Sequence, residues 1–311
     1  MITVLAGGVG GGRFLQGLIE VLPQREVTVI SNTGDDLEMF GLHVSPDIDI
    51  VTYHLAGLSD DEQGWGLAGD TFHALEALGR FGHPTWFHLG DRDLATNLHR
   101  TLLLHGGQTL SQATAEIARA FCLEVAILPM TDDRMRTRVL TDDGYLDFQD
   151  YMVRRQTDAR VKSVQYEGVL ETKPAPGVIE AIMEAEGVIL APSNPIASIG
   201  PILAVPGVRG ALVQTTARVA AVSPIVGGAV IKGPADKMLS GMGMEVSAWQ
   251  VGWLYEDFLD CLVIDHADAG LERRIRGLGL DVVVTDTIMK DRERKAALAR
   301  TVLDAIRTAR T

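Results

Sequence analysis

Seven short apolar runs, rich in valine and isoleucine, recur along this chain of 311 residues, and helical patterns separate most of them. They are residues 2–6, 27–30, 125–128, 187–191, 219–222, 261–264 and 282–284. Strands that are apolar on both faces belong to a parallel sheet covered by helices on each side. The sequence therefore predicts an α/β fold with a Rossmann-like, doubly wound, mostly parallel sheet.

The pattern changes between about residues 130 and 172, where short alternating segments replace the apolar runs. Residues 138–140 and 145–148 flank Asp142-Asp143-Gly144, which is a typical hairpin turn. We expect one α/β domain over residues 1–311, with a small β-rich insertion over residues 130–172.

The amino-acid composition of the chain narrows the kinds of molecule that it is expected to bind. The chain has 28 basic and 41 acidic residues, a net charge of −13, and no run of Lys and Arg. This balance argues against binding to nucleic acid or to an anionic membrane. Only two cysteines occur, and no basic segment followed by an apolar signal region opens the chain. The most apolar stretch, residues 211–231, contains arginine, proline and paired glycines, so we expect a cytoplasmic protein without a membrane span.

A glycine-rich loop, Gly-Gly-Val-Gly-Gly-Gly-Arg at residues 7–13, links the first apolar run to an apolar helix. Glycine lets the backbone approach a ligand, and a helix start offers unpaired N–H groups to an anion. The loop is neither a P-loop nor a clean dinucleotide fingerprint. It predicts a phosphate cradle, and the alternative is a tight strand-to-helix corner.

Acidic residues follow the second predicted strand, in Ser-Asn-Thr-Gly-Asp-Asp at residues 31–36. Open α/β sheets place ligands at this end of a strand. Asp35 and Asp36 beside a phosphate loop suit Mg²⁺, which binds one or two carboxylates together with water and phosphate oxygens. The alternative is a solvated turn.

Two further segments read as helix starts. Ser45 has the position of an N-cap, with Pro46 at the first helical position, so Asp47 could simply compensate the helix dipole. Asp70-Thr71 is predicted to open a helix that runs through residues 72–78.

The charged loop at residues 89–96 contains Arg92 between Asp91 and Asp93. Arg92 could bind a phosphate or pair with either neighbour. Ser193 and Asn194, between two prolines, are suited to present polar groups to a heterocycle edge.

A second glycine loop, residues 223–228, leads to Lys232, for which a phosphate role and an ordinary surface position are both open. Zinc spacings and a Gly-x-Ser-x-Gly elbow are missing from the sequence. The last helix, about residues 291–308, is assigned to packing.

Taken together and in order, these loops resemble the 2-phospho-L-lactate transferase family, which makes the deazaflavin coenzyme F420. The resemblance runs nearly end to end. The matching stretches are residues 7–11 (GGVGG), 32–36 (NTGDD), 45–49 (SPDID), 64–66 (GWG) with 69–71 (GDT), 90–96 (GDRDLAT), 129–133 (PMTDD), 192–195 (PSNP), and 223–228 (SPIVGG) with 232–234 (KGP).

Membership would imply transfer of a phosphoryl-linked small acid from a guanosine diphosphate-type donor to the ribityl hydroxyl of the deazaflavin Fo, with release of GMP and with Mg²⁺. The acid would be phospholactate, phosphoenolpyruvate or 3-phosphoglycerate. The resemblance places donor phosphates and nucleotide at Gly8, Gly10, Gly11, Arg13, Ser193, Asn194, Gly227, Gly228 and Lys232. It places the acceptor at Asn32, Asp49, Asp70 and Arg92, the catalytic carboxylates at Asp35, Asp36 and Asp49, and the metal on Asp35 and Asp49.

Two other functions fit parts of the sequence. A nucleotide-sugar or dinucleotide-binding regulator would use the same glycine loop without catalysis, but it would gain nothing from clustered carboxylates beside a diphosphate. An NAD-dependent oxidoreductase would need a ribose-binding acid, which Asp35 or Asp36 could mimic. Residues 248–258, with Trp249 and Trp253, could form a homodimer face or an ordinary core helix.

Overall fold

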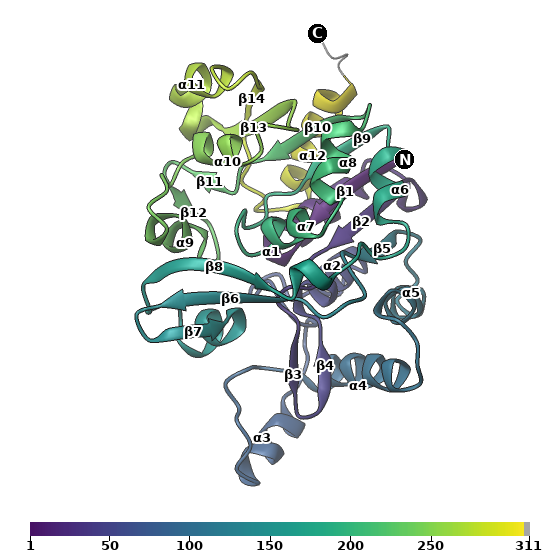
Figure 1. The fold of residues 1–311 in the computed structure, drawn as a ribbon. Helices are drawn as coiled ribbons and strands as arrows, with labels where there is room; N and C mark the ends of the chain where they lie inside the picture. The colour runs from purple at the N-terminus through teal and green to yellow at the C-terminus, as the bar shows by residue number, and fades with distance from the viewer. Residues whose placement is uncertain (308–311) are drawn as a thin grey trace.

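The computed structural model describes residues 1–307. Its centre is a seven-stranded sheet in the order β14-β13-β10-β9-β1-β2-β5, and every neighbouring pair is parallel (Figure 1). The strands are β1 (Ile2–Ala6), β2 (Val27–Ser31), β5 (Ala126–Pro129), β9 (Gly187–Leu190), β10 (Arg218–Val222), β13 (Cys261–Asp265) and β14 (Asp281–Thr285). Each predicted apolar run forms one of these strands, so the predicted fold class is confirmed.

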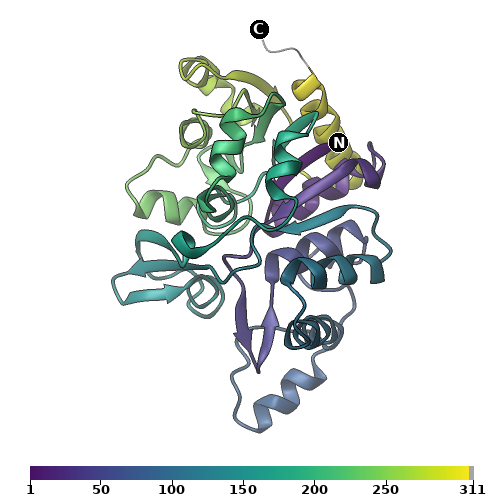
Figure 2. The same ribbon diagram turned by 45° about the vertical axis from the view of Figure 1, so that its right-hand side comes forward.

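Helices cover both faces of the sheet, as Figure 2 shows from a second side. Alternate residues of β1 face opposite layers: Val4 packs with one buried cluster and Leu5 with the other. The Val4 side is covered mainly by α1 (Gly8–Leu18), α2 (Pro46–Leu55), α5 (Leu110–Ala120) and α12 (Arg292–Arg307). The Leu5 side is covered by α6 (Val178–Met183), α7 (Ile199–Ala204), α8 (Val208–Gln214), α10 (Ala248–Leu254) and α11 (Glu272–Arg276).

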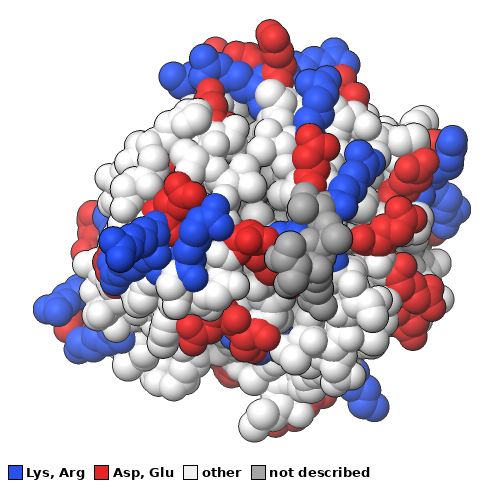
Figure 3. Space-filling model, turned by 90° about the horizontal axis from the view of Figure 1, so that it is seen from above, with Lys and Arg blue, Asp and Glu red and all other residues white. Residues whose placement is uncertain are grey.

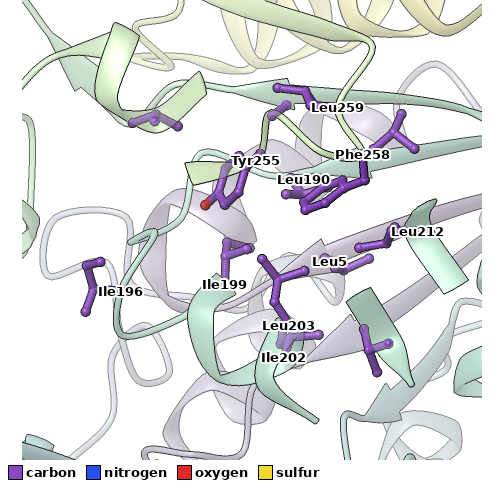
Figure 4. Close-up of a cluster of buried hydrophobic side chains, with 14 of the residues drawn as sticks. Leu5, Leu190, Ile196, Ile199, Ile202, Leu203, Leu212, Tyr255, Phe258 and Leu259 are labelled. Carbon is purple, nitrogen blue, oxygen red and sulfur yellow. The ribbon is translucent and has the colours of Figure 1, made fainter. Parts of the chain in front are cut away.

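Figure 4 shows part of the cluster on the Leu5 side. Leu5 and Leu190 of the sheet lie near Phe258 and near Ile199 and Leu203 of α7. Strands buried on both faces need apolar side chains at every position, which explains why they are continuous apolar runs in the sequence.

Three small antiparallel sheets add to the central one. The segment expected to be β-rich forms the sheet β7-β6-β8, from β6 (Arg136–Thr141), β7 (Gly144–Asp147) and β8 (Val161–Glu167), and β6 turns into β7 at Asp142-Asp143. The other two are the hairpins β3 (Leu37–Met39) with β4 (Leu42–Val44), and β11 (Ile225–Val226) with β12 (Ala229–Val230). The first hairpin and the β7-β6-β8 sheet project from the same end of the molecule (Figures 1 and 2).

One predicted helix start is wrong. The helix expected from Asp70 begins three residues later, as α3 (His73–Arg80), because the Asp70 carboxylate accepts hydrogen bonds from the backbone N–H groups of Arg92 and Asp93. Asp70 therefore caps α4 (Asp91–His105). Asp91 in turn accepts from the N–H groups of His73 and Ala74, so the two helices cap each other.

The other helix starts are as expected or nearly so. Ser45 is the N-cap of α2 and Pro46 is its first residue, but the Ser45 hydroxyl donates to Asp36 Oδ2 (2.8 Å) and makes no side-chain cap. The predicted last helix is α12, and Thr308 lies outside the described residues. The remaining α-helix within residues 1–307 is α9 (Ala235–Gly241), and short 3₁₀ or π segments are η1 (Gln24–Glu26), η2 (Asp150–Arg154), η3 (Val169–Glu171) and η4 (His266–Leu271). No helix within residues 1–307 combines the length and the apolar character needed to span a bilayer.

Residues 248–258 contain α10, which buries Ala248 and Val251 in the core, while Trp253 is exposed. On the face shown in Figure 3, acidic and basic side chains are interspersed, and this mixture agrees with the absence of a run of Lys and Arg in the sequence.

Gly17 gives a test of how closely α1 packs against α12. A Cβ at Gly17 would overlap the carbonyl group of Lys295. Gly17→Ala should therefore lower the free energy of unfolding by about 2 kcal/mol or more, measured by urea denaturation. Gly210 lies in α8 with nothing near its missing Cβ, so Gly210→Ala should be neutral or stabilise by up to about 1 kcal/mol. Equal effects of the two substitutions would contradict this packing.

Candidate active site

A cavity of about 780 Å³ lies at the carboxyl edge of the sheet. The loops after β1, β2, β9, β10 and β14 supply part of its wall. Residues of α2, of the segments 65–66, 86–93 and 148–156, and of the loop before α9 also line it. Among the residues expected to act, Gly8, Gly10, Arg13, Asp35, Asp49, Ser193, Asn194 and Lys232 all line it. The carboxyl ends of parallel strands meet at one edge, which is why loops far apart in the sequence converge here.

The glycine loop begins α1 at Gly8, whose φ is 63° and whose N–H donates to Asp47 Oδ1 (2.9 Å). Val9 and Gly10 line the cavity in the first turn of α1, where a helix leaves its N–H groups without a partner in the helix itself. A Cβ at Gly10 would overlap the carbonyl oxygen of Pro192. The glycines thus form a tight corner and also leave amides available to an anion.

The loop after β9 contacts this corner directly. The Ser193 hydroxyl donates to the Gly7 carbonyl (2.7 Å) and accepts from the Gly7 N–H (3.2 Å). Asn194 Oδ1 accepts from the N–H groups of Ile196 and Ala197. Both side chains help to shape the wall, and Asn194 Nδ2 has only a weak contact, with Met238 Sδ at 3.5 Å.

Two cations line the cavity beside the glycine loop. Arg13 donates to the carbonyl oxygen of Asp61 (2.8 Å), and Lys232 donates to the carbonyl oxygen of Gln63. Burial and the nearby Arg13 lower the pKa of Lys232. The segment 61–63 therefore provides a hydrogen-bond partner for each cation without neutralising either, since a carbonyl carries no formal charge, and Arg13 Nε is buried with no partner within residues 1–307.

Four aspartates line the cavity: Asp35, Asp47, Asp49 and Asp93. Burial, followed by repulsion from Asp47, raises the pKa of Asp35 well above its ordinary value. Asp35 Oδ1 is sealed from solvent and has no hydrogen-bond partner within residues 1–307. Burial raises the pKa of Asp47 to about 6, although Asn32 Nδ2 and the Gly8 N–H both donate to this carboxylate.

Asp49 is held differently, in a buried ion pair. Both of its oxygens accept from the guanidinium of Arg100, which is fully buried and also donates to Asn97 Oδ1 (2.6 Å). Burial raises the pKa of Asp49, and the positive charge of Arg100 opposes this.

Asp93 completes the group. The Tyr53 hydroxyl donates to Asp93 Oδ1 (2.7 Å), and Asn97 Nδ2 donates to the same oxygen (3.2 Å). Burial, together with repulsion from Asp49, raises the pKa of Asp93 to about 7. Two helices meet through these polar side chains, because Asp49 and Tyr53 belong to α2 while Asp93, Asn97 and Arg100 belong to α4.

Several residues expected to act do not line the cavity. Asn32 donates to Asp47 and to the Ala197 carbonyl, so it supports the wall from behind. Asp36 accepts from Ser45 and contacts His43 Nε2 (2.9 Å), which ties it to the β3–β4 hairpin. The others outside the cavity wall are Gly11, Asp70, Arg92, Gly227 and Gly228.

Sequence reasoning missed other residues of the wall: Asp47, Tyr53 and Asp93 were not expected to act there, nor were the aromatic residues Trp65, Trp86, Phe87 and His88 or the segment 287–290. Helical spacing could have indicated some of them. Asp93, Asn97 and Arg100 recur at intervals of four and three, the pattern of one helix face, and polar residues on a buried face call for partners.

The structure is therefore a doubly wound α/β protein with a large cavity at the carboxyl edge of its sheet, a class in which ligands bind at that edge. The family model for 2-phospho-L-lactate transferase CofD matches residues 2–305. The chain belongs to this family of coenzyme F420 biosynthesis, and it is a transferase.

Relatives match over nearly their whole length. The chain is 44% identical over 308 residues to a phosphoenolpyruvate transferase of Streptomyces coelicolor, covering 97% of each chain. It is 42% identical over 306 residues to a 2-phospho-L-lactate transferase of Methanothermobacter thermautotrophicus, covering 98% of each chain. Two crystal structures of a Bacillus halodurans protein, one described as a UPF0052 family member, share the fold with TM-scores of 0.63 and 0.65 at 17% and 18% identity, covering 97% of this chain and 98% of that protein.

The ion pair between Asp49 and Arg100 makes a stability prediction. Asp49→Asn leaves a buried guanidinium without its counter-charge and should cost about 3–5 kcal/mol in urea denaturation. The double variant Asp49→Asn, Arg100→Met removes both charges and should recover much of that loss. Asp147→Asn breaks an exposed pair with Arg138 and should cost at most about 1 kcal/mol. If Asp49→Asn lowers the free energy of unfolding as little as Asp147→Asn does, the buried ion pair between Asp49 and Arg100 is refuted.

Proposed function

We propose that this transferase moves a phosphoryl-linked three-carbon acid from a guanosine diphosphate-type donor to the ribityl hydroxyl of the deazaflavin Fo, with release of GMP. The observation that carries the proposal is that Gly10, Asp35, Asp49 and Asn194, from four separate segments, surround one cavity. Relatives at similar identity are named for phosphoenolpyruvate and for 2-phospho-L-lactate. Phosphoenolpyruvate is the first acid to test, because several relatives at 42–44% identity are named for it.

The donor diphosphate is assigned to the start of α1. The N–H groups of Val9 and Gly10 are in the first turn of α1 and suit phosphate oxygens, and Arg13 and Lys232 lie on the same wall. Phosphate oxygens are stronger acceptors for these cations than the carbonyl oxygens of Asp61 and Gln63. Ser193 and Asn194 are assigned to the nucleotide, next to the phosphates, as the resemblance implies.

The acceptor ring is assigned to the aromatic part of the wall. Trp65, Trp86, Phe87 and His88 line the cavity, and two of the four tryptophans of the chain are among them. Trp65 and His88 contact each other, with ring centroids 6.3 Å apart. A planar tricyclic ring is well suited to stack on such a surface.

Asp35 fits a magnesium ligand, since it lines the cavity and its Oδ1 is buried and has no hydrogen-bond partner within residues 1–307. No group of three or more His, Cys, Asp or Glu side chains within residues 1–307 is arranged to hold a metal, but Mg²⁺ needs only one or two carboxylates when phosphate oxygens complete its shell. When bound, Mg²⁺ would neutralise donor charge. Asp49 is already paired with Arg100, so we assign it to orienting the acceptor hydroxyl and keep Asp35 for the metal.

Phosphoryl transfer demands mainly alignment and charge neutralisation, and no covalent intermediate on the protein is required. The amides of α1, Arg13 and Lys232 would hold the donor, while the aromatic wall would hold the acceptor. The cytoplasmic location and the homodimer expected from the sequence stay predictions.

The reaction can be tested directly. Purified protein with Fo, Mg²⁺ and guanylylated phosphoenolpyruvate or phospholactate should yield GMP and an Fo derivative whose mass identifies the transferred acid. Omitting Fo should stop GMP release beyond slow hydrolysis. Binding of NAD without binding of Fo would refute the transferase assignment and favour an oxidoreductase.

Lys232 tests the donor side. Lys232→Met should raise the KM for the donor about 10- to 100-fold, because a charge-assisted hydrogen bond to phosphate is worth about 1.5–3 kcal/mol, while the KM for Fo stays unchanged. Lys162→Met, which removes a lysine from an exposed pair with Asp142, should leave both KM values unchanged. An unaltered donor KM in Lys232→Met would remove Lys232 from the donor site.

A further inference from the structure

We propose that Asp93 accepts the proton of the acceptor hydroxyl during transfer. This inference rests on the proposed function and deepens it, because it gives the base a different identity from the carboxylates that the sequence suggested. The family resemblance assigned no role to Asp93, and the assignment follows from the contacts around its carboxylate.

The carboxylate of Asp93 has one occupied and one free oxygen. Oδ1 accepts from Tyr53 (2.7 Å) and Asn97 (3.2 Å), so the group is fixed in orientation. Oδ2 has no hydrogen-bond partner within residues 1–307, is not among the sealed polar atoms, and belongs to a residue of the cavity wall. A hydroxyl group bound in the cavity can therefore donate to Oδ2.

The other three carboxylates are less suited to hold a proton from the substrate. Both oxygens of Asp49 accept from Arg100, whose positive charge favours the ionised form. Asp47 accepts from the Gly8 N–H and from Asn32, one on each oxygen. Asp35 is the carboxylate whose buried, unpartnered oxygen we assign to the metal.

The surroundings of Asp93 also give its carboxyl group a pKa that suits a general base. Its pKa of about 7 follows from burial and then from repulsion by Asp49, whereas Tyr53 and Arg100 oppose the rise. The remaining charge that faces it is Asp70, from the segment before α3, which raises it further. A general base works best when its pKa lies near the working pH.

Asp93 also lies at a suitable place in the chain. It is in the first turn of α4, a few residues after Phe87 and His88 of the aromatic wall, and its partner Tyr53 follows Asp49 by one helical turn. Phe87, His88 and Asp93 line the same cavity, so a ligand whose ring rests on the aromatic wall would share that cavity with the Asp93 carboxylate.

The step balances as follows. The hydroxyl oxygen forms a bond to the phosphorus that carries the three-carbon acid, and the bond from this phosphorus to the GMP oxygen breaks. GMP leaves with that electron pair. The hydroxyl proton passes to Asp93 Oδ2 and later to water. No oxidant, reductant or further reactant is needed.

Asp93→Asn is the first test. It should lower kcat about 10²- to 10⁴-fold while the KM values for Fo and donor stay within about threefold. In the wild-type protein kcat should rise with pH through about 7, as Asp93 loses its proton, and this rise should vanish in Asp93→Asn. Asp132→Asn, which alters a carboxylate that accepts from Ser111 in the first turn of α5, should keep the wild-type rate and profile.

Tyr53→Phe is the second test and does not depend on how well Asp93→Asn folds. The Tyr53 hydroxyl favours the ionised carboxylate, so its loss should move the rise in kcat to higher pH. A purely structural contact would lower stability without moving the profile. Asp93→Glu should retain a pH-dependent activity.

The outcomes separate the two proposals. Suppose that the wild-type protein turns over Fo and that Asp93→Asn has a kcat within threefold of the wild-type value, or shows the same rise of kcat with pH. This result would overturn the role of Asp93 and leave the proposed transferase function intact. If thermal melting shows that Asp93→Asn is unfolded, the test depends on Tyr53→Phe. A pH profile of kcat that does not shift in Tyr53→Phe would then overturn the role of Asp93. No product from Fo at any pH would overturn both proposals.

Discussion

The arrangement of the cavity depends on one carboxylate, Asp47. Its Oδ1 accepts from the Gly8 N–H at the start of α1, and its Oδ2 accepts from Asn32 at the end of β2. Asn32 also donates to the Ala197 carbonyl in the segment after β9. Asp47 thus fixes three segments of the sheet edge against α2, the helix in which it lies. A buried polar group must be hydrogen-bonded to be tolerated, so these segments are held in one relative position.

The buried carboxylates of the site lower the stability of the folded protein at neutral pH. The pKa values of about 6 for Asp47 and about 7 for Asp93 lie above the ordinary 3.8. The folded protein therefore keeps protons that the unfolded chain has released, and the stability that these two groups contribute falls as the pH rises from about 4 to about 7. Arg100 supplies one compensating charge within the protein. A cation bound near Asp35 would supply another, which is a physical reason for a metal-dependent ligand site here.

The sheet could be predicted from the sequence, and much of the cavity could not. Each strand of the parallel sheet is buried on both faces and is therefore a continuous apolar run, a signal contained in five or so residues. The pairing of Asp49 with Arg100 joins residues 51 positions apart, and that of Tyr53 with Asp93 joins residues 40 apart. Such contacts depend on how α2 and α4 pack, which local patterns do not specify. Asp70 shows the same limit, because its local sequence predicts a helix start at that position, whereas its carboxylate accepts hydrogen bonds from the start of another helix, α4.

The glycine loop shows why two interpretations of one motif need not compete. Because Gly7 and Gly10 have no side chains, the start of α1 comes close to Asp47 and to the Pro192 carbonyl. A Cβ at Gly7 would overlap the Asp47 carboxylate, and a Cβ at Gly10 would overlap the Pro192 carbonyl oxygen. This is the tight corner that the sequence offered as the alternative to a phosphate cradle. The same corner places Val9 and Gly10, in the first turn of α1, on the cavity wall. Since the first N–H groups of a helix attract an anion, the packing of the corner would itself produce the phosphate-binding surface that we propose.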